Sequence, residues 1–201
     1  MRIAMIVPAL LIAVSANAQD FSYRYVDVLG SYSKNNESNI TLDTANVTVS
    51  LQSHAGALLQ IAVGAGQADD IAAAAGGPDG DVRSVEFFLG GARQLSDATS
   101  AWTGFGIGRT SIEPDRGADA DINTARFSLG LRHWLVSRVE AHGSTSILYF
   151  DNDDLGSEVE DVELRAGLRF YPLSNLSLSI EGAYQFDERV EIGAVSLRYD
   201  F

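Results

Sequence analysis

The chain contains no cysteine and a single lysine, Lys34. Without cysteine there is no disulfide, so stability has to come from another closed framework. The chain has 14 basic and 27 acidic residues, which gives a formal net charge of −13 at pH 7. Nucleic-acid affinity depends on clustered Lys and Arg that neutralise phosphates. The composition therefore excludes a nucleic-acid partner.

Long hydrophobic runs are also missing. The one apolar stretch covers residues 3–14, follows Arg2, contains Pro8 and stops short of the ~20 residues that a membrane helix needs. A basic start, a short apolar run and small residues at Ala16 and Ala18 are typical of a secretory signal peptide cut after Ala18. We therefore expect residues 1–18 to be a signal peptide and residues 19–201 to be one mature domain. Losing Arg2 leaves 13 basic residues against 27 acidic ones, a net charge of −14.

The mature sequence has no helical period and alternates instead with a period of two, which places two sets of side chains on opposite faces of a strand. The tail shows this best, because alternate residues from Gly193 to Phe201 are apolar while Arg198 and Asp200 lie between them. Five more segments alternate in the same sense, at 44–51, 84–92, 124–132, 162–171 and 176–187. One face suits lipid and the other suits water.

Weaker segments at 21–33, 57–67, 100–111 and 137–150 bring the expected number of strands to ten. Short turns at 53–56, 96–99, 136–137 and 172–175 alternate with longer, acidic connections at 34–39, 69–81, 113–121 and 151–161. This rhythm is typical of membrane β-barrels, and a closed sheet satisfies every backbone group in lipid. The predicted fold is an all-β, closed antiparallel up-and-down transmembrane β-barrel of about ten strands. Eight strands result if the segments at 21–33 and 57–67 are mispaired.

The C-terminal residues Val195, Leu197, Tyr199 and Phe201 alternate apolar with polar and end in an aromatic ring. This pattern resembles the terminal assembly signal of Gram-negative outer-membrane proteins, and the whole mature chain resembles their small barrels of the OmpA-barrel and OmpX-like type. The resemblance implies an integral protein of the cell outer membrane, in contact with lipid and lipopolysaccharide and inserted by the barrel assembly machinery. The chain departs from OmpA in having ten expected strands, where the OmpA barrel has eight, and no peptidoglycan-binding domain after Phe201.

The inward faces of the predicted strands carry charges of both signs at similar depth. Unpaired charges are costly in a lumen walled off from water, so we expect ion pairs of Glu140 with Arg132 or Arg169, and of Glu181 with Arg165 or Arg198. Such pairs predict a lumen plugged by salt bridges, and an ion-selective pore is the alternative. The expected lumen charge network is Glu86, Arg126, Arg132, Glu140, Glu163, Arg165, Arg169, Glu181 and Arg198.

Aromatic residues gather near predicted strand ends, where rings anchor membrane proteins at the bilayer interface. One expected girdle, at the end with the short turns, consists of Trp134, Phe170, Tyr171, Tyr199 and Phe201. The sequence does not decide whether the Trp102 side chain points outward or into the lumen.

The sequence His142-Gly143-Ser144 resembles a fragment of outer-membrane lipid A deacylases, with Glu140 or Glu163 as a candidate orienting carboxylate. The pair is expected near a short turn, far from the outer leaflet, and Thr145 stands where Asn would follow the serine. A lumen-filling histidine accounts for it better, so no catalytic residue is predicted.

No cofactor or metal is expected. The three histidines have no metal-ligand spacing, and the acidic stretch from Asp151 departs from a calcium loop at Leu155 and Val162. The main functional hypothesis is a non-enzymatic integral barrel with a structural or interaction role and a mostly plugged lumen. The alternatives are a narrow porin-like channel and a lipid-modifying hydrolase.

Overall fold

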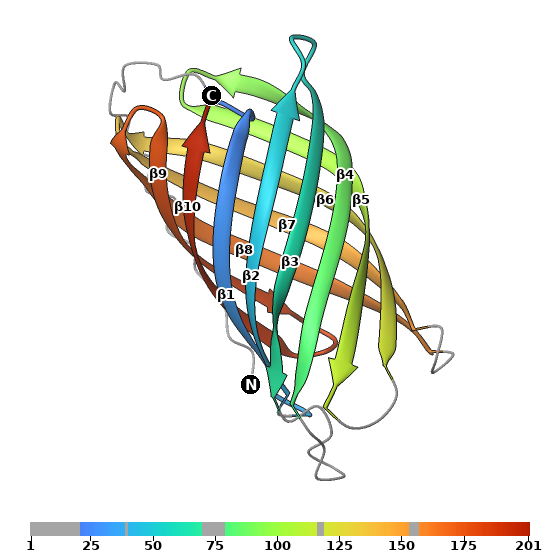
Figure 1. Ribbon diagram of the computed structural model, residues 1–201. Coiled ribbons are helices and arrows are strands. Elements are labelled where there is room, and N and C mark those ends of the chain that lie inside the picture. Colours follow the sequence, from blue (N-terminus) through green and yellow to red (C-terminus); the bar gives the residue numbers. More distant parts are fainter. Residues whose placement is uncertain (1–20, 39, 70–78, 116–118, 153–156) are drawn as a thin grey trace, which may run out of the picture.

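Ten antiparallel strands form one closed barrel in the computed structural model, which describes residues 21–38, 40–69, 79–115, 119–152 and 157–201 (Figure 1). Each strand pairs with its neighbours in the chain, and β1 closes the sheet by pairing with β10 from Tyr25↔Asp200 to Asn35↔Val190. This confirms the predicted fold and excludes the eight-strand alternative. The strands are β1 Tyr25–Asn35, β2 Thr41–Gln52, β3 Ala57–Asp69, β4 Gly80–Ser96, β5 Thr99–Pro114, β6 Ala120–Val136, β7 Val139–Asn152, β8 Ser157–Leu173, β9 Leu176–Gln185 and β10 Val190–Asp200.

The distribution of side chains is the reverse of that in a soluble protein. Leu89 and Ile180 are each 64% exposed on the outside of the barrel, whereas Glu140 is fully buried inside it. Because strand side chains alternate between the two faces, the apolar set points outward and the polar set fills the lumen. No helix among the described residues is long and apolar enough to span a membrane.

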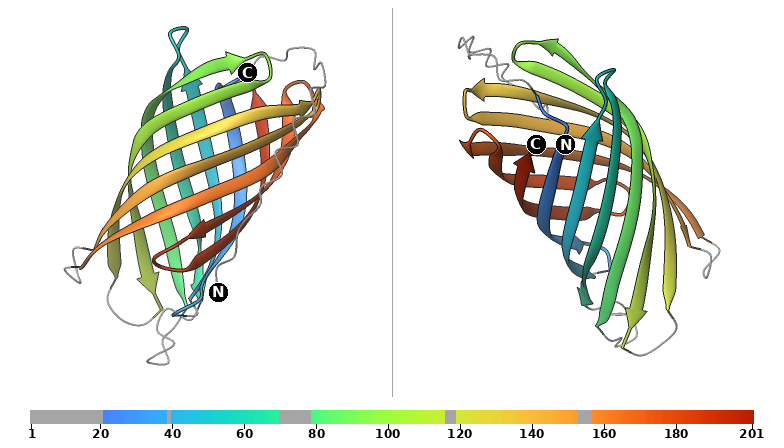
Figure 2. Two further views of the ribbon diagram at one scale, coloured as in Figure 1. Left: turned by 180° about the vertical axis from the view of Figure 1, so that it is seen from behind. Right: turned by 45° about the horizontal axis from the view of Figure 1, so that its top comes forward.

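The two ends of the barrel differ. Turns at 53–56, 97–98, 137–138 and 174–175 close hairpins at one end, called here the short-turn end, where the C terminus also lies (Figure 1). The amide of Phe201 donates to the carbonyl of Arg24 there, over 3.0 Å. The opposite end, where β1 and β9 end and β2 and β10 begin, is called the long-loop end. Figure 2 shows the strands wrapping obliquely round a single lumen between these ends.

Two predicted segment boundaries are wrong, one at the start of β1 and one at the start of β8. The segment expected as a strand from residue 21 becomes β1 only at Tyr25, and in the preceding residues the side chains of Phe21 and Tyr23 are buried inside the barrel. The connection expected at 151–161 is shorter, because β8 begins at Ser157. The proposed cleavage residues Ala16 and Ala18 lie outside the described residues.

Asp161, expected in a loop, is almost fully buried near the long-loop end of β8. Its Oδ1 accepts hydrogen bonds from the amides of Phe186 and Asp187, at 2.9 and 3.0 Å. Its Oδ2 accepts one from the amide of Glu188 at 3.3 Å. The turn between β9 and β10 needs these acceptors because its amides lie outside the sheet ladder, and Arg189 adopts a positive φ of 52° within it. A side chain of β8 thus fixes the turn that precedes the last strand.

Candidate functional site: the barrel lumen

A cluster of buried apolar side chains fills the lumen toward the short-turn end. We call it the septum, and its members are Phe21, Tyr23, Leu58, Phe88, Trp134 and Tyr171. Phe21 stacks on Trp134 with ring centroids 5.6 Å apart, and Trp134 meets Tyr171 at 5.0 Å. Rings at these separations attract one another beyond the apolar area that they bury. The septum is therefore built from side chains of residues 21–24 and of the barrel wall.

Polar contacts hold the N-terminal segment in place. The carbonyl of Ser22 accepts hydrogen bonds from Arg132 Nη1 at 2.7 Å and from Arg198 Nη2 at 2.6 Å. The Tyr23 hydroxyl lies 2.8 Å from Ser100 Oγ, within hydrogen-bond distance. Hydrogen bonds to charged donors are stronger than neutral ones, so two guanidinium groups on one carbonyl anchor the segment firmly.

Trp134 and Tyr171 were expected in an interfacial girdle, and that prediction is wrong for both, because each is only 4% exposed and faces the lumen. The period of two contains the signal: Trp134 has the parity of Arg132, and Tyr171 has the parity of Arg169. Phe170, Tyr199 and Phe201 are exposed on the outer face as expected. The girdle was predicted from how close these residues lie to a strand end. Their alternation with Arg132 and Arg169 would have assigned both side chains to the lumen.

Next to the septum lies a tight ion pair. Arg132 binds Glu140 with two parallel hydrogen bonds, Nε to Oε1 at 2.9 Å and Nη2 to Oε2 at 2.7 Å. Arg169 Nη1 lies 3.6 Å from Glu140 Oε1, and the Tyr171 hydroxyl donates to Oε2 at 3.4 Å. The carboxylate of Glu140 is thus buried, paired and held in one orientation.

Farther from the short turns, the charges are arranged more loosely around Glu181. Its carboxylate lies 3.3 Å from His142 Nε2, 3.5 Å from Arg165 Nη1 and 3.8 Å from Arg169 Nη2. Arg165 also lies 3.2 Å from Glu163. These distances are longer than those of the bidentate pair at Glu140, so Glu181 is shared among two guanidinium groups and one imidazole.

The other two basic residues of the predicted network have separate partners. Arg198 pairs with Asp200 instead of Glu181, and its guanidinium lies 3.7 Å from the centroid of the Tyr25 ring. Arg126 pairs with Glu86 at 2.5 Å, and both side chains are about 30% exposed. Asp200 and Asp27, which faces Arg169 at 3.8 Å, also lie in the lumen and were absent from the predicted set. Asp27 was missed because β1 alternates weakly in sequence.

Trp102, whose facing the sequence left open, points into the lumen and meets Phe88 edge-on at 5.7 Å. Its indole lies over Gly130 of the adjacent strand, where a Cβ atom would lie 2.3 Å from Trp102 Cε2. Such a contact is impossible without movement, so the glycine provides the space that the indole occupies. The wall glycines thus make room for large side chains in a narrow lumen.

Above the septum, toward the long-loop end, the lumen holds a cavity of about 190 Å3, called here the lumen cavity. His142 Nε2 faces Glu181 at 3.3 Å, and among the described residues neither ring nitrogen of His142 hydrogen-bonds to Ser144, so the two are not arranged as base and nucleophile. The His142–Ser144 pair thus lacks the geometry of a hydrolase. The lumen cavity is lined by Tyr23, Tyr25, Asp27, Leu29, Gln60, Trp102, Arg132, His142, Gly143, Ser144, Arg165, Arg169, Glu181 and Arg198.

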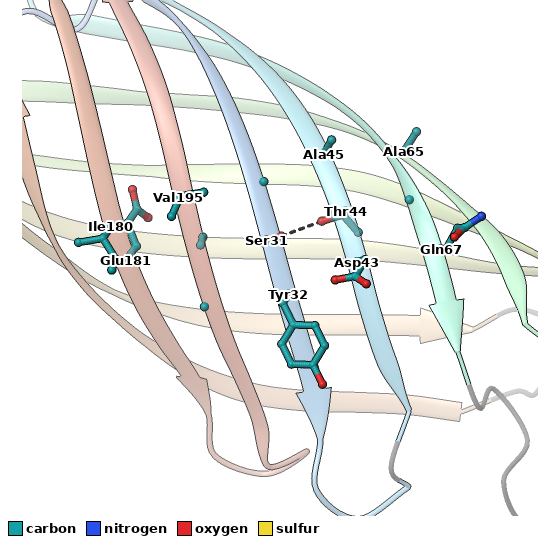
Figure 3. A pocket seen from close by; sticks show the side chains of 14 residues that line it. Ser31, Tyr32, Asp43, Thr44, Ala45, Ala65, Gln67, Ile180, Glu181 and Val195 are labelled. Atoms are coloured by element: carbon teal, nitrogen blue, oxygen red, sulfur yellow. Dashed lines mark hydrogen bonds between the residues drawn. The ribbon is translucent and has the colours of Figure 1, made fainter.

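A wider recess of about 830 Å3 lies on the outer wall across β9, β10, β1, β2 and β3 (Figure 3). Small residues such as Gly30, Ala45 and Ala65 make its floor, and Tyr32 and Asp43 lie toward the long-loop end. The recess is on the outer side of the wall, and the hydrogen bond between Ser31 and Thr44, at 2.7 Å, lies on the lumen side. It is a hollow in the outer face of the barrel wall.

The barrel resembles solved structures of two porins. The chain matches the KdgM porin at 10% identity, covering 88% of this chain and 99% of that one, with a TM-score of 0.50. It matches the NanC porin at 13% identity, covering 88% of this chain and all of that one, with a TM-score of 0.52. The chain has the fold of a small outer-membrane β-barrel.

At these identities, the likeness concerns the fold alone. No protein-family model matches the sequence, and no curated protein matches it. The narrower likeness to OmpA and OmpX stays a prediction. So does the assembly role of Val195, Leu197, Tyr199 and Phe201, which all lie exposed on the outer face at the end of the chain.

Proposed function

We propose that this protein is an integral outer-membrane barrel whose lumen is closed toward the periplasm, with a structural or interaction role and no steady conductance. The observation that carries this proposal is the septum. Five of its six members carry aromatic rings, and each of these side chains is no more than 9% exposed: Phe21, Tyr23, Phe88, Trp134 and Tyr171. Ions cross a hydrophobic constriction only when water fills it.

The outer surface supports insertion. Exposed large hydrophobic residues include members of every strand from β1 to β10, for example Val28, Phe105 and Leu168. A continuous apolar wall of this kind is stable in lipid, whereas in water it would be an exposed patch far larger than soluble proteins carry. Placing the short turns toward the periplasm leaves the long-loop end at the cell surface, where the loops contact lipopolysaccharide or other partners.

A narrow porin-like channel is the second candidate. It is favoured by the polar lumen and by the fold shared with the KdgM and NanC porins. Under this alternative the septum is displaced in the conducting state. The two candidates differ in one observable, the current through the unmodified barrel.

Planar-bilayer recording of the purified chain tests the proposal. We expect no steady single-channel current from the wild type, and openings from a Phe21→Ala/Tyr23→Ala variant, because that variant removes two septum side chains contributed by the N-terminal segment. A Phe170→Ala variant, altered on the outer face, serves as the matched control and should stay silent. Regular openings of the wild type would favour the channel instead.

A further inference from the structure

The lumen cavity contains polar atoms that the protein itself leaves without partners. Asp27 Oδ1, Arg169 Nε and His142 Nδ1 are buried, and none has a hydrogen-bond partner among the described residues. All three side chains line the lumen cavity. A buried polar atom without a partner costs free energy, so three of them around one small cavity indicate a group that satisfies them together.

The remaining atoms of these side chains are already engaged with the network. Arg169 Nη2 lies 3.8 Å from both Asp27 Oδ2 and Glu181 Oε1, and His142 Nε2 lies 3.3 Å from the same Glu181 oxygen. Arg169 and His142 therefore share a neighbour, and Asp27 faces Arg169. The partnerless atoms belong to one group of side chains with fixed positions.

The chemistry of these atoms defines a ligand. Arg169 Nε donates, and so does His142 Nδ1 when it carries the ring proton, whereas Asp27 Oδ1 accepts. We propose that the lumen cavity binds a small carboxylate that bears a hydrogen-bond donor on the neighbouring carbon, as α-hydroxy and α-amino acids do. The ligand carboxylate accepts from Arg169 and His142, and its hydroxyl or ammonium group donates to Asp27.

The size of the cavity limits the ligand. At about 190 Å3 it is smaller than the ~300–1,000 Å3 of pockets for drug-sized ligands and holds the volume of about six waters. Acids of three or four carbons fit this space, whereas oligosaccharides do not. The inference rests on the proposed function in one respect: since the septum closes the short-turn end, the ligand enters from the long-loop end.

Isothermal titration calorimetry of the full chain, folded in detergent micelles, tests the site with four probes. L-Lactate and L-alanine carry both groups, propionate lacks the donor, and ethanolamine lacks the carboxylate. We expect lactate or alanine to bind at one site per barrel, and propionate and ethanolamine to bind at least tenfold more weakly, because each leaves a buried group unpaired. The stronger of the two binders identifies the hydroxyl or the ammonium as the preferred donor.

Variants locate the binding. Asp27→Asn and Arg169→Gln should each weaken binding of the preferred probe at least tenfold, whereas Arg126→Gln should keep the wild-type affinity, because its pair with Glu86 lies outside the cavity lining. A gel shift on boiling shows which variants are folded, and His142→Gln replaces either one that is not.

Equal binding of all four probes, or no binding of any, would mean that only solvent occupies the cavity and would overturn the site. That failure is separate from failure of the proposed function, which depends on the conductance of the wild type.

Discussion

The lumen of this barrel has two parts, which differ in how closely their charged side chains are paired. In the septum and beside it, Glu140 is fully buried, and Arg132 binds it by two hydrogen bonds no longer than 2.9 Å. In the lumen cavity Glu181 lies 3.3–3.8 Å from one imidazole and two guanidinium groups, and three nearby polar atoms lack partners among the described residues. The same residue types thus form a fully paired cluster in one part and a polar cavity with unpartnered atoms in the other. Whether a charged part of the lumen is filled or holds a cavity depends on how many of its polar atoms have hydrogen-bond partners within the protein.

Removing the central acid of the tight region should have the largest effect. Glu140→Gln leaves Arg132 and Arg169 buried beside a neutral group, and breaking such a buried pair costs about 3–5 kcal/mol. Urea unfolding of the barrel from lipid vesicles measures the loss. The matched change in an accessible part of the lumen is Glu86→Gln, where the pair is about 30% exposed, and it should cost no more than about 1 kcal/mol. Similar losses at the two sites would remove the distinction between them.

A smaller effect should follow from filling the space under Trp102. Gly130→Ala places a methyl group where the indole lies, and overpacking of this kind costs about 1–3 kcal/mol. Gly193→Ala is the control, since a Cβ there meets nothing within 4 Å, and its free energy of unfolding should stay within about 0.5 kcal/mol of the wild type. Tryptophan fluorescence during the same unfolding experiment reports whether Trp102 has moved. Unchanged stability and emission in Gly130→Ala would show that the indole has room elsewhere.

Much of the fold was predictable because the pattern is local. Alternation along each strand assigned the outward-facing and lumen-facing residues, as Leu197 and Arg198 show on β10. Closure followed from the requirement that a sheet in lipid has no open edge. The strand count and the pairing of neighbours then followed from the hairpin rhythm.

The septum was harder to predict because it depends on contacts between distant parts of the chain. Phe21 and Trp134 are far apart in sequence, and nothing local indicates that the chain before Tyr25 turns into the lumen. Partner choice within the network was likewise open, as with Arg198, which contacts Asp200 on its own strand. The distance of each residue from its short turn predicted which charged side chains lie at the same depth in the barrel. Which of them form ion pairs depends on their rotamers and on the space that the wall glycines leave.

The absence of cysteine makes one labelling measurement especially direct. Ser144→Cys places the only thiol in the chain at the lumen cavity, and Ser137→Cys at an exposed turn reports which way the barrels face in lipid vesicles. With a membrane-impermeant maleimide, we expect Ser144→Cys to react from the long-loop side and to stay unlabelled from the short-turn side, until Phe21→Ala and Tyr23→Ala are added. Rapid labelling from the short-turn side with Phe21 and Tyr23 intact would contradict a lumen closed by the septum.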